Sequence, residues 1–212
     1  MKMTMEDRNT ALEIINRLLE AGLATKYFDK EEPYLSTWFY KTFGYGNSLT
    51  FADGASKAVF INSNFEWVIK INLPREEHNW CGREYENYRL AEEYGLTYYF
   101  ASCEYLGEFE GIEFYAQEYV DCNEEVDSEI YNSLKHRYDS SNMKYDEDCL
   151  WDELDNLEAD ERVDLLYNDE ELVCFILERH INDLHCGNFG IKGDHYVIID
   201  YCGFGDFIFE EE

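Results

Sequence analysis

The stretch "INDLHCGNFGIKGDHYVIIDYCGFG", residues 181–205, predicts a polar loop, a short strand, a tight turn, a second strand and a glycine-containing end. Asp183 and Asn188 are five residues apart in the loop, so both side chains can project toward one cleft. Asp200 ends the strand "YVIID" and precedes a glycine turn. Amide and carboxylate oxygens suit a magnesium ion that is held partly by phosphate and water. The order of these residues therefore predicts a metal site at Asn188 and Asp200, although each fragment alone also fits an ordinary polar loop.

Upstream lies a β-rich region with a lysine in an apolar setting. The segment "SLTFADGASKAVFINSNFEWVIKINL", residues 48–73, predicts one strand that is broken at Gly54 and two more around the turn "NSN". Lys70 stands in the last of these strands with apolar neighbours on both sides. A buried ammonium group needs a counter-charge or a ligand. An isolated strand lysine, in contrast, is more often an edge residue that points to water.

From Glu76 the pattern becomes helical and Gly95 ends it, with one face formed by Cys81, Tyr85, Tyr88 and Ala91. Glu84 lies near this face, so its carboxylate can pair with Lys70. Glu86, on a more polar face, is the alternative partner. Most glutamates on such a helix are solvated, and the pattern alone does not choose between the two.

The N-terminal part of the chain predicts a helix followed by an aromatic-rich segment. Residues 10–22 carry helical apolar spacing, with Thr10 and Glu13 as a capping box and Gly22 as the stop. Residues 28–48 are rich in aromatic side chains and predict a strand or a short helix around "TWFYKTF".

The remaining segments complete the expected plan. Residues 98–109 and 112–120 predict two strands joined by a turn near Glu110-Gly111, and "ELVCFILERH", residues 171–180, predicts a buried helix. The expected order is a helix, a β-rich region with one inserted helix, and then a mainly helical region.

Taken together, these motifs resemble the protein-kinase-like superfamily, especially its compact branch with aminoglycoside and choline kinases and small prokaryotic or phage kinase-like proteins. The resemblance implies that Lys70 contacts the nucleotide phosphates and pairs with Glu84. It implies that Asp183 is the catalytic base, within "NDLHCGN", and that Asn188 and Asp200 bind magnesium. The implied cofactors are ATP and Mg²⁺.

The resemblance also assigns supporting roles. It makes His185 a hydrogen-bonding brace for the base. The strand "FYAQEYV" resembles the linker between lobes, where backbone groups around Glu118 to Val120 would meet adenine. The segment "DGASKAVF" stands where a glycine-rich loop is expected, and its candidate phosphate-holding residues are Gly54, Ser56 and Lys57.

The fold class implied is α+β, a two-lobed minimal protein-kinase-like fold. Residues 1–120 would form the N-terminal helix and an antiparallel, nucleotide-binding sheet lobe with one inserted helix. Residues 121–212 would form a truncated, mainly helical lobe with the catalytic loop and the metal-binding turn. The chain ends nine residues after Gly203, so the later helices that bind peptide substrates in full protein kinases are expected to be missing.

The charge of the chain favours a second interpretation. Its 212 residues include 17 basic and 47 acidic side chains, a formal charge of −30. Direct binding of nucleic acid is disfavoured by this charge, and solubility is its most common explanation. Residues 121–170 alone hold 18 acidic and 4 basic side chains. The alternative function is therefore a catalytically inactive, kinase-shaped acidic protein that binds a basic partner by mimicking nucleic acid, for example a phage anti-defence protein.

Cysteine content and hydropathy indicate where in the cell the protein is expected. The seven cysteines form no C-x-x-C pair, which argues against a disulfide scaffold and a zinc ribbon. The N-terminus lacks a signal-peptide pattern and no apolar run reaches membrane-spanning length. We expect a soluble, cytoplasmic protein, without a membrane partner. The phosphate acceptor and the oligomeric state stay open.

Overall fold

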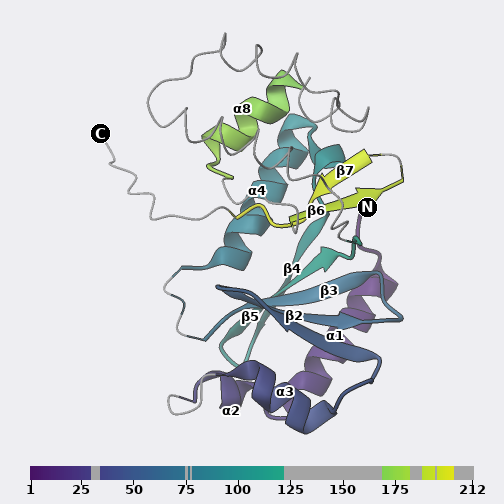
Figure 1. The fold of residues 1–212 in the computed structure, drawn as a ribbon, viewed down its shortest axis with the longest axis vertical. Helices are drawn as coiled ribbons and strands as arrows, with labels where there is room; N and C mark the ends of the chain where they lie inside the picture. Colours follow the sequence, from purple (N-terminus) through teal and green to yellow (C-terminus); the bar gives the residue numbers. More distant parts are fainter. Residues whose placement is uncertain are drawn as a thin grey trace. The chain divides into compact units, whose positions relative to one another are not determined.

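The fold is mixed α+β. A computed structural model describes residues 1–29, 34–74, 76, 78–121, 169–181, 188–193 and 195–202. The chain divides into two compact units, which Figure 1 traces in sequence colours. The first unit consists of Met1–Arg89 and Ala101–Tyr119, and the second consists of Leu90–Phe100 with the described residues from Val120 onward.

The first unit is built on a five-stranded antiparallel sheet with the order β1-β2-β3-β5-β4. The strands are β1 (Leu49–Asp53), β2 (Lys57–Asn62), β3 (Trp67–Asn72), β4 (Cys103–Phe109) and β5 (Ile112–Glu118). The strand-like runs between turn residues in the sequence predicted all of these strands. Glu110 and Gly111, which join β4 to β5, both have positive φ, at 52° and 80°. That combination matches the right-handed twist of a tight hairpin.

Three helices cover one face of this sheet: α1 (Met5–Glu20), α2 (Leu23–Tyr27) and α3 (Leu35–Phe43). Figure 1 shows them together on one side of the strands. Because side chains alternate between the two faces of a strand, every second residue of β2, β3 and β5 enters this core. The core is formed by Ala11, Ile15, Leu18, Leu35, Phe39, Ala58, Phe60, Ile69, Ile71, Phe114 and Ala116, among others.

The start of the first helix differs from the prediction. Its capping box is formed by Thr4 and Asp7 instead of Thr10 and Glu13. Hydrogen bonds from Thr4 lower the pKa of Asp7 and favour its ionised form at the helix N-terminus. Both pairs fit the same local pattern. The helix begins at the earlier pair, which adds a further turn to it. Thr10 lies within the helix and donates a 3.1 Å hydrogen bond to the Glu6 carbonyl.

The second unit contains the predicted C-terminal helix and hairpin. Its described elements are η1 (Thr97–Tyr99), α8 (Glu170–Glu178), β6 (Phe189–Lys192) and β7 (His195–Ile198), in addition to the end of α4 (Trp80–Tyr94), which begins in the first unit. Phe100 packs edge-on against Phe175 and Tyr201, with ring centroids 5.6 and 5.1 Å apart. Tyr99 donates a 2.6 Å hydrogen bond to Asp169, which precedes α8. In the part of the chain that the structure describes, no helix combines the length and apolarity needed to cross a bilayer.

Gly190 lies where the hairpin passes the chain at Val120 and Asp121. A Cβ atom on Gly190 would lie 2.9 Å from the Asp121 carbonyl oxygen and would also overlap the Val120 side chain. We expect Gly190→Ala to lower the free energy of unfolding by about 1–3 kcal/mol, because the carbonyl is backbone and cannot move freely. Urea unfolding measures this. Gly54→Ala is the control, since its Cβ would meet open space, and an equal loss in both variants would contradict the steric explanation.

Candidate functional site

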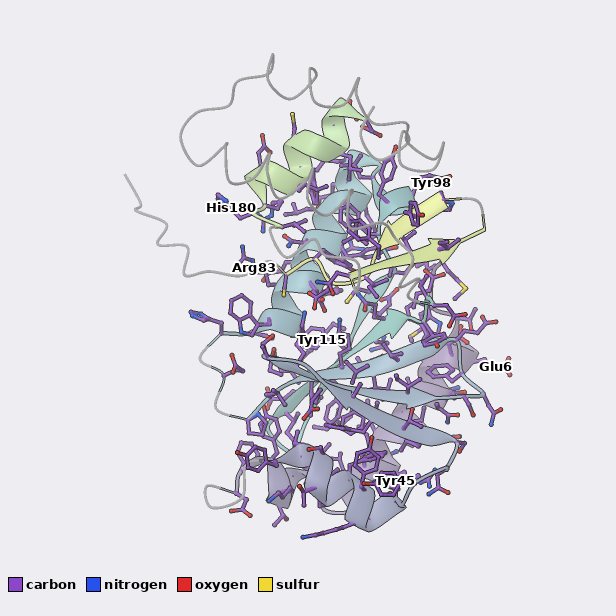
Figure 2. All side chains as sticks on the ribbon, in the orientation of Figure 1. Glu6, Tyr45, Arg83, Tyr98, Tyr115 and His180 are labelled. Atoms are coloured by element: carbon purple, nitrogen blue, oxygen red, sulfur yellow. The ribbon has the colours of Figure 1, made fainter. Side chains whose placement is uncertain are left out.

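The face of the sheet opposite the α1–α3 core is polar. Lys57 on β2 faces Asn72 across the β2–β3 ladder, and Val59 faces Lys70. On the next strand pair, Tyr115 faces Lys70 and Gln117 faces Val68. Because paired residues share a face and residues two apart share a face, Lys57, Lys70 and Gln117 project from the same side. Figure 2 labels Tyr115 on this side of the sheet, away from Tyr45 beside α3.

A single carboxylate from α4 binds both lysines. Lys70 Nζ lies 2.7 Å from Glu84 Oε2 in an ion pair, and Lys57 Nζ donates a 2.9 Å hydrogen bond to Glu84 Oε1. Lys57, Lys70 and Glu84 are 6%, 5% and 0% exposed. Glu86, the alternative partner, is exposed. Charges at this depth are tolerated only when they are paired, so the two ion pairs on Glu84 are a built feature of the unit.

Gln117 extends the cluster toward the end of β5. Its side-chain oxygen accepts a 3.1 Å hydrogen bond from Lys70 Nζ. An ammonium group only donates, so the oxygen and not the nitrogen of the amide faces Lys70. The amide nitrogen, Nε2, is buried and has no hydrogen-bond partner among the described residues.

Two asparagines fix the start of α4 and thereby the position of Glu84. Asn79 accepts a 2.8 Å hydrogen bond from the backbone N–H of Gly82, as an N-cap residue does. Asn72, at the end of β3, accepts at 3.0 Å from the N–H of Cys81 and donates at 2.6 Å to Asn79. The helix that carries Glu84 is therefore tied directly to the strand that carries Lys70.

Cys81 adjoins the charged cluster but is not a nucleophile. Burial, reinforced by the negative charge of Glu84, raises the pKa of its thiol well above the usual value. A neutral, buried thiol packs as a small hydrophobic group and does not attack an electrophile.

In the second unit, the β6–β7 hairpin brings the two predicted metal ligands to one end. Asn188 directly precedes β6, and Asp200 follows β7 after one residue. The Asn188 carbonyl accepts a 2.9 Å hydrogen bond from Ile199, which extends the ladder to this end. Asn188 is buried and Asp200 is half-buried. Cys202 Sγ lies 3.2 Å from Asp200 Oδ1, close enough for its thiol to donate.

These donors fit magnesium. One amide oxygen and one carboxylate are hard ligands, and a site with few protein ligands leaves positions for water and phosphate, as magnesium prefers. Asp183 and His185, the predicted base and its brace, lie outside the described residues.

Some backbone groups of the predicted adenine linker already make hydrogen bonds within the first unit. The backbone N–H of Glu118 donates to the Ser102 carbonyl, and that of Tyr119 donates to the Glu66 carbonyl, both at 2.8 Å. The Glu118 carboxylate accepts a 3.0 Å hydrogen bond from Ser102 Oγ. Contacts with adenine would therefore depend on other backbone groups, such as those of Val120.

The predicted phosphate loop is short. Gly54 opens it and donates a 3.0 Å hydrogen bond to the Lys57 carbonyl. Gly54 has no positive φ and no close neighbour, so neither conformation nor crowding requires glycine there. Ser56 is buried at the loop end.

The sequence pattern predicts Lys57 as a phosphate-holding loop residue but gives no sign of its pairing with Glu84, which spans 27 residues. It does not predict a role for Gln117. The available signal was a polar residue within the apolar strand "FYAQEYV".

No protein-family model matches the chain, and no curated protein matches it. Among solved structures, the streptomycin–ATP–APH(2″)-IIa ternary complex, which contains an aminoglycoside phosphotransferase, is similar over 75% of this chain and 67% of that chain. The sequence identity is 16% and the TM-score is 0.36.

Proposed function

We propose that this chain is an ATP- and magnesium-dependent phosphotransferase of the kinase-like type. The observation that carries the proposal is the buried ion pair between Lys70 on β3 and Glu84 on α4, at 2.7 Å. A buried strand lysine held by a helix carboxylate is the arrangement that presents an ammonium group to nucleotide phosphates in such enzymes. Two oxygen ligands at one end of the β6–β7 hairpin support the same chemistry.

Each residue then has a defined task. Lys70 binds the phosphates, and Glu84 keeps its ammonium group charged and oriented. Asn188 and Asp200 hold the metal, which when bound neutralises phosphate charge. Asp183 accepts the proton from the acceptor hydroxyl as that oxygen bonds to the γ-phosphorus of ATP, the bond from this phosphorus to the bridging oxygen breaks and ADP leaves. His185 braces the Asp183 carboxylate. Rate enhancement of this kind comes from positioning and charge neutralisation rather than from a covalent enzyme intermediate.

Asp200→Asn tests the metal role. We expect it to abolish the thermal stabilisation by magnesium-ATP that the wild type shows, because a neutral amide binds the metal far more weakly than a carboxylate. Transfer of labelled phosphate should be lost with it. Glu178→Gln, which removes one exposed carboxylate from α8 of the same unit, should leave both signals unchanged. A wild type with no ATP-dependent stabilisation and no transfer would refute the phosphotransferase.

The formal charge of −30 supports a second candidate, the inactive acidic protein that binds a basic partner. Its acidic stretch, Asp152 to Asp164, lies outside the described residues. Association driven by this charge would weaken steeply with salt. In that case neutralising the stretch destroys binding of the basic partner, while Asp183→Ala and Asp200→Asn leave it intact. The two candidate functions therefore predict opposite effects for the same variants.

A further inference from the structure

Lys57 is a buried lysine that shares the carboxylate of Glu84 with Lys70. It is the first residue of β2 and directly follows the short loop of residues 54–56. Its ammonium group reaches the same carboxylate as Lys70, on the other oxygen. Each oxygen of the Glu84 carboxylate therefore has its own buried ammonium group beside it.

Sharing one carboxylate allows the two lysines to divide their tasks. If either ammonium group turns toward a ligand, the other remains on Glu84, so the carboxylate is never left buried without a counter-charge. A single lysine would have to satisfy both demands at once. Each ammonium group also has three N–H donors, so both can contact one anionic ligand while Glu84 stays paired.

The amide of Gln117 gives an independent indication of a ligand. Its Nε2 is a buried donor without an acceptor among the described residues, although Gln117 is only 4% exposed. Leaving such a donor unsatisfied in the interior is unfavourable. Its orientation is fixed by the bond from Lys70 to the amide oxygen, so the donor cannot be satisfied by exchanging the two ends of the amide. A ligand that carries hydrogen-bond acceptors would satisfy it.

We infer that Lys57 is a second phosphate-binding residue, which acts with Lys70 on the terminal phosphates of a nucleoside triphosphate. The inference rests on the proposed function. It adds that Lys57 makes the site prefer a nucleoside triphosphate over a nucleoside monophosphate. Placement of Lys57 next to the loop, on the sheet face of Lys70 and Gln117, assigns it to the phosphates rather than to the base or sugar.

The test is the affinity of Lys57→Met for magnesium-ATP and for AMP, measured by calorimetric titration of the full chain. We expect the Kd for ATP to rise about tenfold, the loss of one charge-assisted contact, and the Kd for AMP to change less than about threefold. Lys57→Arg, which keeps the charge, should lose less than Lys57→Met. Lys41→Met, which removes an exposed lysine from α3, is the matched control and should bind as the wild type does.

The outcomes separate this inference from the proposed function. If the wild type binds ATP and Lys57→Met binds it equally well or more tightly, the role of Lys57 is overturned. The proposed phosphotransferase function is not affected by that result. An equal loss for ATP and AMP also overturns the role of Lys57, since Lys57 would then act through the fold. Wild type that binds neither nucleotide overturns both. Melting temperatures of the variants without nucleotide show whether Lys57→Met is folded, and Lys57→Arg provides the comparison if it is not.

Discussion

Replacing Glu84 with alanine is expected to lower the free energy of unfolding by about 3–5 kcal/mol. The carboxylate is fully buried and holds Lys57 at 2.9 Å and Lys70 at 2.7 Å. Its removal takes away the one carboxylate that both buried ammonium groups contact, and burying a charge without its counter-charge is costly. Urea unfolding followed by circular dichroism measures the change.

Two controls test whether the loss of stability comes from the buried charges. Glu86→Ala removes a carboxylate two residues away that is exposed, and surface changes of that kind stay within about 0.5 kcal/mol. The triple variant Glu84→Leu with Lys57→Met and Lys70→Met removes all three charges together. It should recover most of the loss, because a buried ion cluster can be replaced by apolar groups at little cost. Equal losses for Glu84→Ala and Glu86→Ala would contradict a buried charge cluster.

Replacing Lys70 with methionine is expected to reduce phosphoryl transfer by at least about 100-fold, the usual effect of removing one charged group from a transition-state site. The fold should survive, because Lys57 remains paired with Glu84. Transfer of labelled phosphate from magnesium-ATP at saturating concentration is the measurement. Lys41→Met is again the control for the loss of one lysine.

The results of Lys70→Met also discriminate between the two candidate functions. Unchanged transfer by a folded Lys70→Met variant would contradict the role given to Lys70. If neither protein transfers phosphate, yet both bind a basic partner in a salt-dependent way, the acidic binding protein is favoured. Because Lys57 and Lys70 share one carboxylate, the double variant is expected to lose nucleotide affinity beyond either single change, and their coupling is measured by a double-mutant cycle.

Local patterns in the chain were sufficient to predict most elements. Strand-like runs of apolar and aromatic residues, bounded by turn residues, located the five strands. Apolar residues spaced at helical intervals located α4 and α8, and a two-residue turn with glycine located the β4–β5 hairpin. The sequence also placed Lys70, Asn188 and Asp200 in the correct local setting, since a polar residue at a strand end or within an apolar strand stands out without knowledge of the fold.

Where a local rule has two solutions, the pattern was less reliable. Thr10 and Glu13 satisfy the capping-box rule as well as Thr4 and Asp7 do, and only the longer helix shows which pair is used. The choice between Glu84 and Glu86 is similar. Both lie on α4, and the rotation of the helix against the sheet buries the first and exposes the second.

By itself, the sequence determined the order and type of most elements and the residues that could carry the chemistry, while residues 28–48 stayed open between a strand and the helix α3 that the structure has. Only the tertiary structure decided that Lys57 and Lys70 share Glu84, that Gln117 joins them, and that α1, α2 and α3 cover the opposite face of the sheet. The reason is physical. Strand register and helix docking are set by contacts between residues far apart in the chain, and a shift of one residue in register would move Lys57 to the other face.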